Sequence, residues 1–218
     1  MHIQRHFRES RLPVLQALMR EHPLATVVTH TAGVLDAHHL PLLLSADDGA
    51  LGVLRGHVPR ASRVWREVPD GAEVLAIFQG PNHYVSPAWY AAKNEHGKVV
   101  PTWNFVVVHA RGSIRWFQDA LWLREFLETL TAEHEENLPE PWRISDAPSD
   151  YVARMLAAIV GFEIEITAIE GKWKLNQNRS SADRAGVVAA LRASGSAAAD
   201  AIATLVENVG PRPSSEGE

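Results

Sequence analysis

Two stretches decide the fold: V-L-A-I-F-Q-G-P-N-H-Y-V-S-P-A-W-Y at residues 74–90, and V-P-T-W-N-F-V-V-V at residues 100–108. Each contains a β-branched and aromatic run of strand length, Val74 to Phe78 and Phe105 to Val108, which predicts two buried strands. Flat and polar side chains crowd between these runs: Gln79, Asn82, His83, Tyr84, Ser86, Trp89, Tyr90, Thr102, Trp103 and Asn104. Such a rim suits a planar ligand rich in heteroatoms, because rings can lie against its face while amides and hydroxyls bond its edge. A wide hairpin with a solvated loop is the alternative.

The composition is that of a soluble globular chain. With 218 residues, 46% of them hydrophobic and 22% charged, it can bury a core, and we expect one main domain with helical additions. The formal charge of −5 argues against a broad electrostatic footprint for nucleic acid or anionic membrane. The absence of cysteine excludes disulfides, thiolate metal sites and cysteine nucleophiles. The sequence shows neither an apolar leader nor an uncharged run of membrane-spanning length, so we expect a cytoplasmic protein without a membrane partner.

Strand and helix patterns fill the rest of the chain. Strands are expected at 24–30, 34–44, 51–54, 105–117 and 162–169, the first two forming a hairpin. Pro41 cannot donate to a ladder, so the second strand should lie at an edge or bulge there. Helices are expected at 10–20, after Asp119, from Ser149, and in an Ala-rich pair at 182–193 and 197–209.

Two further segments concentrate ligand-type groups. The first, G-H-V-P-R-A-S-R at residues 56–63, sets two arginines and a histidine at the mouth of an expected short helix, where free N–H groups and the positive dipole end favour an anion. The second, K-W-K-L-N-Q-N-R-S at residues 172–180, holds two lysines, an arginine, three amides and a tryptophan. For each segment, a solvated basic turn or loop is the alternative.

Metal and DNA sites are not predicted. The acidic run at residues 133–136 contains one histidine, with no second histidine at helical spacing, so it fits a solvated helix end better than a metal site. The Ala-rich pair suggests a helix-turn-helix, but its second helix has no arginine, lysine or glutamine to reach a base edge or a phosphate. Residues 210–218 are expected to form a disordered tail.

Five motifs, in order along the chain, resemble the PaiB-type FMN-binding negative transcriptional regulators. They are H-L-P-L-L-L at residues 39–44, G-H-V-P-R-A at 56–61, F-Q-G-P-N-H-Y-V-S-P-A-W-Y at 78–90, V-P-T-W-N-F at 100–105, and K-L-N-Q-N-R-S with D-R within 174–184. Each motif alone is weak, whereas the five together cover most of the chain. Asn82 and Asn176 stand where relatives often carry other residues, and neither affects the implied fold.

The resemblance implies a mainly β, α+β fold: an FMN-binding split β-barrel, similar to that of the pyridoxamine-phosphate oxidases, with peripheral helices and two Ala-rich C-terminal helices. We divide the chain accordingly into a split-barrel domain at 1–180, a packed helical pair at 181–209 and the tail at 210–218. The resemblance also implies a homodimer with FMN at the subunit interface. The family name suggests DNA as a partner, although neither the charge nor a motif supports it.

Carried onto this chain, the resemblance assigns cofactor contacts residue by residue. Arg60 and His57, with the backbone at Ala61, would hold the flavin phosphate through charged hydrogen bonds. The other contacts would bond or pack against the rest of the cofactor: His39, Gln79, Tyr84, Ser86, Trp89, Tyr90, Thr102, Trp103, Asn104, Lys174, Gln177, Asn178 and Arg179. No residue is assigned as catalytic or as a metal ligand. Core packing for Trp89 and Trp103, and strand-end hydrogen bonding for Asn104, are the alternatives.

Three functions stay open on the sequence. The first is an FMN-binding regulatory protein whose effect on DNA is indirect or arises from a surface of the dimer. The second is a flavin-dependent oxidoreductase, in which bound FMN accepts a hydride and the protein supplies orientation and hydrogen bonds. The third is a haem-binding split barrel, for which His83 and His109 are the nearest candidates for an axial ligand.

Overall fold

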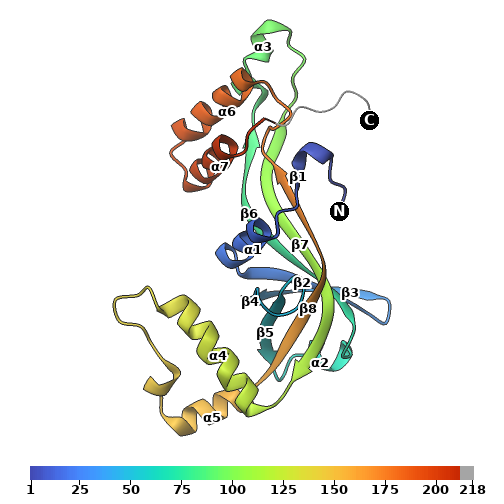
Figure 1. Ribbon diagram of the computed structural model, residues 1–218, viewed down its shortest axis with the longest axis vertical. Coiled ribbons are helices and arrows are strands. Elements are labelled where there is room, and N and C mark those ends of the chain that lie inside the picture. The colour runs from blue at the N-terminus through green and yellow to red at the C-terminus, as the bar shows by residue number, and fades with distance from the viewer. Residues whose placement is uncertain (212–218) are drawn as a thin grey trace. The chain divides into compact units, whose positions relative to one another are not determined.

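The computed structural model describes residues 1–211, so residues 212–218 of the predicted tail lie outside the described part of the chain. Contacts divide the chain into two compact units, each built from separate stretches. Unit 1 comprises residues 1–22, residues 78–109 and the chain from Glu170 onward, and unit 2 comprises residues 23–77 and 110–169. Three long strands contribute to both units: β6 (Glu73–Val85), β7 (Thr102–Phe117) and β8 (Ile159–Lys174) (Figure 1).

The remaining elements belong to one unit each. Unit 1 holds η1 (Arg5–Phe7), β1 (Arg8–Glu9), α1 (Leu12–Glu21), η2 (Pro87–Trp89), α3 (Ala92–Glu95), α6 (Ser181–Ala193) and α7 (Ala197–Asn208). Unit 2 holds β2 (Leu24–Thr31), β3 (Val34–Pro41), β4 (Leu43–Ser45), β5 (Val53–Pro59), α2 (Val64–Glu67), α4 (Ala120–Glu135), η3 (Ile144–Asp146) and α5 (Ser149–Ala157). The strands form an eight-stranded sheet in the order β3-β2-β6-β7-β8-β5-β4, with β1 paired to β8.

A tight hairpin joins β2 and β3 in unit 2. Ala32 and Gly33 at its turn have φ values of 50° and 81°, the left-handed region that such two-residue turns require. The register pairs Leu24 with Pro41 and Thr31 with Val34. Alternate β2 residues are buried, because successive side chains in a strand point to opposite faces of the sheet.

One face of the β2, β3 and β6 strands is apolar and open to solvent. Leu24 is 66% exposed and Leu35 is 71% exposed. β3 lies at the edge of the sheet, and each of its residues is exposed or half-buried. We call this surface the β2–β3–β6 face; the register assigns to it Leu24, Thr26, Val28, His30, Leu35, Ala37, His39, Pro41, Leu75 and Ile77.

Helix α4 covers a different part of unit 2. The side chain of Asp119 caps its first turn by accepting from the N–H groups of Leu121 and Trp122 at 3.1 and 2.9 Å, as the sequence predicts. Leu123 of α4 packs with Ile144, Val152 and Leu156 in a small core that joins α4, η3 and α5. This core holds the segment that links α4 to α5 against the helix.

Close packing on glycine shapes unit 1. A Cβ atom at Gly171 of β8 would lie 2.3 Å from Leu15 Cδ2, so only glycine lets α1 lie this near the strand. A Cβ atom at Gly186 of α6 would lie 2.1 Å from the carbonyl oxygen of Trp89. The absence of a side chain at this position therefore allows α6 to pack directly against η2. The buried Arg184 of α6 donates to the carbonyl oxygens of Val206 and Val209 and so closes the C-terminal end of α7.

The predicted α+β class and the C-terminal helical pair are confirmed, but several boundaries differ. β6 extends well beyond the predicted apolar run and includes the polar residues 79–84, whereas β7 begins at Thr102, three residues before the predicted start, and ends at Phe117 as predicted. The expected strand at 34–44 is interrupted: β3 ends at Pro41, and the Leu42 N–H donates to the Pro23 carbonyl at 2.9 Å before β4 begins. The first helix begins at Leu12, with Arg11 and not Ser10 before it. The division at residue 180 stays a prediction.

Candidate functional site

A surface of aromatic and basic side chains occupies one face of three strands in unit 1. We call it the platform and define it by two residues from each strand: Asn82 and Tyr84 on β6, Trp103 and Phe105 on β7, Lys172 and Lys174 on β8. The two residues of each pair share a face because they lie two positions apart in a strand. The residue between each pair is more buried than at least one of its neighbours, and Asn104 and Trp173 are fully buried.

Contacts across the strands join the platform into one surface. Trp103 Nε1 donates to Asn82 Oδ1 at 3.1 Å, and the Tyr84 and Trp103 rings meet edge to face with centroids 6.1 Å apart. Lys172 Nζ lies 5.6 Å from the centroid of the Phe105 ring. Trp103 is 49% exposed and Tyr84 is 43% exposed. Large flat side chains held open to solvent and close to hydrogen-bonding groups are typical of a site for a planar ligand.

The platform carries positive charge that lacks a carboxylate partner. Lys174 Nζ donates to Thr102 Oγ1 at 2.6 Å, and Lys172 Nζ donates to the His2 carbonyl at 3.1 Å. Within residues 1–211 neither lysine forms an ion pair; Glu170, the nearest carboxylate along β8, pairs with the Met1 amino group at 3.2 Å. Burial lowers the pKa of Lys174, and repulsion from Lys172 lowers it further. An anionic ligand would favour the charged ammonium and so act against both effects.

A buried chain of hydrogen bonds lies behind the platform. Asn104 Nδ2 donates to Asn176 Oδ1 at 2.5 Å, and Asn176 Nδ2 donates to the Tyr90 hydroxyl at 3.0 Å. Asn176 has φ of 60°, a left-handed conformation that asparagine tolerates. The Arg179 guanidinium lies 4.8 Å from the centroid of the Tyr90 ring, and burial raises the pKa of the Tyr90 phenol, which stays neutral. These bonds tie together β7, the residue that follows η2, and the loop after β8, and Arg179 of that loop lies over the Tyr90 ring.

Two of the predicted contacts in unit 1 already have structural partners. Gln177 is buried, accepts from the Leu175 N–H at 2.8 Å and donates to the Trp173 carbonyl at 2.6 Å. Ser86 Oγ accepts from the Ala88 N–H at 3.2 Å and caps η2. Both side chains therefore shape the backbone beside the platform.

The remaining predicted contacts of unit 1 differ in exposure. Gln79 and Asn178 are exposed, and Trp89 is half-buried. The Trp89 ring lies 6.3 Å from the ring of His83. His83 Nδ1 is itself 2.6 Å from the Tyr84 carbonyl oxygen, so this ring nitrogen is already bonded.

Arg60, the predicted phosphate ligand, is a structural cross-link in unit 2. Its Nε donates to the Ala157 carbonyl at 2.7 Å, one terminal nitrogen donates to Gln118 Oε1 at 2.6 Å, and the other donates to the Ile159 carbonyl at 3.0 Å. Its own carbonyl accepts from Trp65 Nε1 at 2.9 Å. The guanidinium thus closes the C-terminal end of α5, where free carbonyl groups and the negative dipole end favour a cation.

The other predicted contacts of unit 2 have mixed surroundings. His39 lies on the β2–β3–β6 face with Nδ1 3.3 Å from Thr26 Oγ1. His57 is half-buried, packs edge to face on Phe126 with centroids 6.0 Å apart, and has a buried Nδ1 without a hydrogen-bond partner in the described chain. Burial lowers the pKa of His57. Ala61 is exposed, and α2 is a single turn, too short for the helix dipole that the predicted anion site invoked.

The structure therefore distributes the predicted contacts over both units. His39, His57, Arg60 and Ala61 belong to unit 2, and the other twelve belong to unit 1. The assignment to the cofactor omitted four residues that the structure places on or behind the platform: Asn82, Phe105, Lys172 and Asn176. In each of the three strands the platform residues are two positions apart: Asn82 and Tyr84, Trp103 and Phe105, and Lys172 and Lys174. This spacing is the sequence signal that predicts a shared face within each strand.

Residues 1–211 contain neither a cluster suited to a metal ion nor a membrane-spanning helix. In that range, no group of three or more histidine, aspartate or glutamate side chains is arranged to hold a metal ion. None of the described helices has both the length and the apolar character needed to cross a membrane.

Comparison with known proteins gives the family. Residues 1–168 match the family described as "Putative FMN-binding domain". The chain belongs to this family. Two relatives extend over nearly the whole chain: an uncharacterised protein of Emericella nidulans is 33% identical over 247 residues (96% of this chain, 98% of that protein), and the protease synthase and sporulation protein PAI 2 of Bacillus subtilis is 30% identical over 208 residues (95% and 97%).

A solved structure shares the fold of this FMN-binding domain. The FAD and haem binding protein from Mycobacterium smegmatis superposes with a TM-score of 0.59 at 17% identity, over 77% of this chain and 73% of that chain. The resemblance stated from the five motifs and the split-barrel class are thus confirmed. The chain is a flavin-binding protein of the split-barrel class, with FMN as the cofactor of its family.

Proposed function

We propose that the platform of unit 1 binds FMN, with the isoalloxazine ring against Trp103 and Tyr84 and the phosphate facing Lys172 and Lys174. The single observation that carries this assignment is the pair of lysines on β8, neither of them ion-paired in the described chain, with Lys172 over the half-buried Phe105 ring of β7. The phosphate is the anionic group of oxidised FMN, and a flavin ring gains most from stacking on flat side chains. Asn82 supplies an amide at the edge of this surface.

Arg60 is the rival anchor for the phosphate, and its contacts argue against it. Three of its five N–H groups already donate to oxygen atoms of the chain. Releasing them would uncap α5 and leave the half-buried Ile159 carbonyl without this donor, which costs about 1–3 kcal/mol. Lys174 has a single hydroxyl partner to exchange.

Binding of FMN and riboflavin to matched variants tests the phosphate assignment, because riboflavin lacks only the phosphate. We expect Lys174→Gln to weaken FMN binding about tenfold or more, the value of a charged hydrogen bond, and to leave riboflavin binding nearly unchanged. Lys98→Gln, an exposed lysine of the same unit outside the platform, is the charge-matched control. Fluorescence quenching of the free flavin measures both affinities.

The ratio of the two affinities decides between the anchors even if a variant is less stable. If Arg60→Gln abolished the preference for FMN over riboflavin while Lys174→Gln kept it, the phosphate would belong to unit 2 and the platform assignment would fail. If Trp103→Ala lowered the affinities for FMN and riboflavin by the same factor and so kept the preference for FMN, the result would support ring stacking on the platform.

We also infer that the chain forms a homodimer through the β2–β3–β6 face. The face carries no Lys, Arg, Asp or Glu among its ten residues, and it includes an edge strand whose polar backbone groups are open on one side. A neutral, apolar surface of this kind is self-complementary and suits a two-fold contact between identical chains.

The cellular role that we propose is regulatory, of the PaiB type. Support comes from the near full-length relation to PAI 2 of Bacillus subtilis, a sporulation protein by its name. An oxidoreductase is the second candidate, because the exposed platform would leave one face of the flavin open to a hydride donor. Anaerobic mixing of FMN-loaded protein with NADPH separates them: rapid bleaching with turnover on an added acceptor would favour the oxidoreductase.

A further inference from the structure

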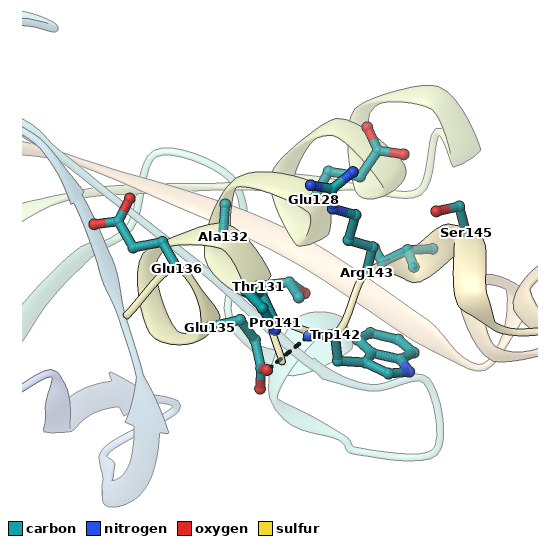
Figure 2. A pocket seen from close by; sticks show the side chains of 10 residues that line it. Glu128, Thr131, Ala132, Glu135, Glu136, Pro141, Trp142, Arg143 and Ser145 are labelled. Carbon is teal, nitrogen blue, oxygen red and sulfur yellow. Dashed lines mark hydrogen bonds between the residues drawn. The ribbon is translucent and has the colours of Figure 1, made fainter. Parts of the chain in front are cut away.

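A cavity of about 450 Å³ lies in unit 2 between the second half of α4 and the segment that follows it (Figure 2). One wall is a helical stripe at spacings of three and four: Glu128, Thr131, Ala132, Glu135 and Glu136. The facing wall is the continuous segment from Pro141 to Ser145. The volume falls in the range of sites that enclose small organic molecules.

The facing wall is anchored and presents an aromatic ring. Ile144 is buried in the core shared by α4 and α5, and the Trp142 N–H donates to Glu135 Oε2 at 2.9 Å. Trp142 is nevertheless 48% exposed, with its ring beside Glu135 at one end of the cavity (Figure 2). Pro141 and Ala132 extend the apolar lining next to it. An indole held in place yet uncovered is a preferred surface for a cation, because its face carries a negative quadrupole.

The charges that line the cavity are unbalanced at the same end. At the far end, Glu128 forms an ion pair with Arg124 at 2.9 Å. The side chain of Arg143 also points toward Glu128 (Figure 2). Glu135 and Glu136 instead lie at the C-terminal end of α4, where the helix dipole is already negative and where His134 is the basic residue of the last turn. Carboxylates are unfavourable at this position unless a positive charge lies near them.

We propose that this cavity binds a small organic cation: a primary ammonium or guanidinium group attached to an aromatic or aliphatic body. The charged group lies by Glu135 and Glu136, and the body packs against Trp142 and Pro141. An organic cation fits better than a metal ion, because residues 1–211 hold no cluster of carboxylates and histidines arranged for a metal and much of the lining is apolar.

Three probes of similar shape test the proposal: 2-phenylethylammonium, 2-phenylethanol and phenylacetate. Their binding to the full chain loaded with FMN is measured by calorimetry and ligand-observed NMR. We expect the ammonium to bind, the alcohol to bind at least about fivefold more weakly and the carboxylate not to bind, with added salt weakening the ammonium alone. Trp142→Ala and Glu136→Gln should each weaken the ammonium about three- to tenfold, and Trp142→Phe should retain most of the affinity.

Glu133→Gln is the matched control, because it makes the same charge change on α4 outside the cavity and should leave binding within about twofold. The proposal fails if phenylacetate or phenylethanol binds as tightly as the ammonium, if Glu133→Gln and Glu136→Gln are equally damaging, or if none of the probes binds up to about 10 mM.

Discussion

Lys174 and Arg60 show at the scale of single residues how contacts decide what a charge is free to do. Both are cations in segments that the sequence marks as ligand-binding. Arg60 donates to three oxygens of its own unit, whereas Lys174 donates to one hydroxyl. A guanidinium engaged in this way must lose existing bonds before it gains new ones, and for this reason we propose the lysine as the phosphate partner.

His57 supplies a prediction at the same scale. Burial lowers its pKa, so below about pH 6.5 the folded chain binds fewer protons than the unfolded chain. The stability associated with the neutral ring is fully present above that pH and is lost as the pH falls toward the lowered value. We expect His57→Gln to flatten the decline in the free energy of unfolding between about pH 7 and pH 5.5, measured by urea titration of the cofactor-free protein.

His134 provides the control for that measurement. It is an exposed histidine of the same unit outside the β2–β3–β6 face, so His134→Gln makes the same substitution at a site open to solvent. A decline of unchanged steepness in His57→Gln would show that the buried imidazole does not contribute.

Gly186 carries a prediction at the scale of elements. In an ordinary helix, replacing glycine by alanine gains up to about 1 kcal/mol. Here a Cβ atom would lie 2.1 Å from the Trp89 carbonyl, so we expect Gly186→Ala to lower the free energy of unfolding by about 1–3 kcal/mol, because α6 must move away from η2. Chemical denaturation monitored by circular dichroism measures the change.

Ala185→Gly, at the exposed neighbouring position, calibrates that experiment. It should cost about 1 kcal/mol from helix propensity alone. If Gly186→Ala proved stabilising, the close approach of α6 to η2 would not exist in solution.

The β2–β3–β6 face carries a prediction for the whole molecule. We expect Leu35→Glu to convert a dimer into a monomer, because a carboxylate would be buried in a neutral, apolar contact. Light scattering coupled to gel filtration reports the mass. Leu121→Glu is the matched control: Leu121 is 73% exposed, close to the 71% of Leu35, but lies on α4 outside the face. A monomeric parent, or equal masses for parent and Leu35→Glu, would remove the proposed contact.

The sequence by itself determined the α+β class, the five motifs of the family and, through capping and apolar spacing, the helices that begin at Ala120, Ser149 and Ser181. These features are local: Asp119 caps its own helix, and the residues of each motif are neighbours in the chain. The extent of β6 was underestimated, and the start of β7 was placed three residues late, because polar residues break the apolar pattern while the ladder continues.

Only the tertiary structure decided which charged groups are free. Arg60 and Lys174 look alike in the sequence, and their partners come from residues about 60 to 100 positions away. The platform likewise depends on strand register, which brings together β6, β7 and β8 from distant parts of the chain, and the cation cavity depends on a segment folding back over α4. Local patterns specify helices and turns, whereas contacts between distant segments depend on register and packing that single residues do not encode.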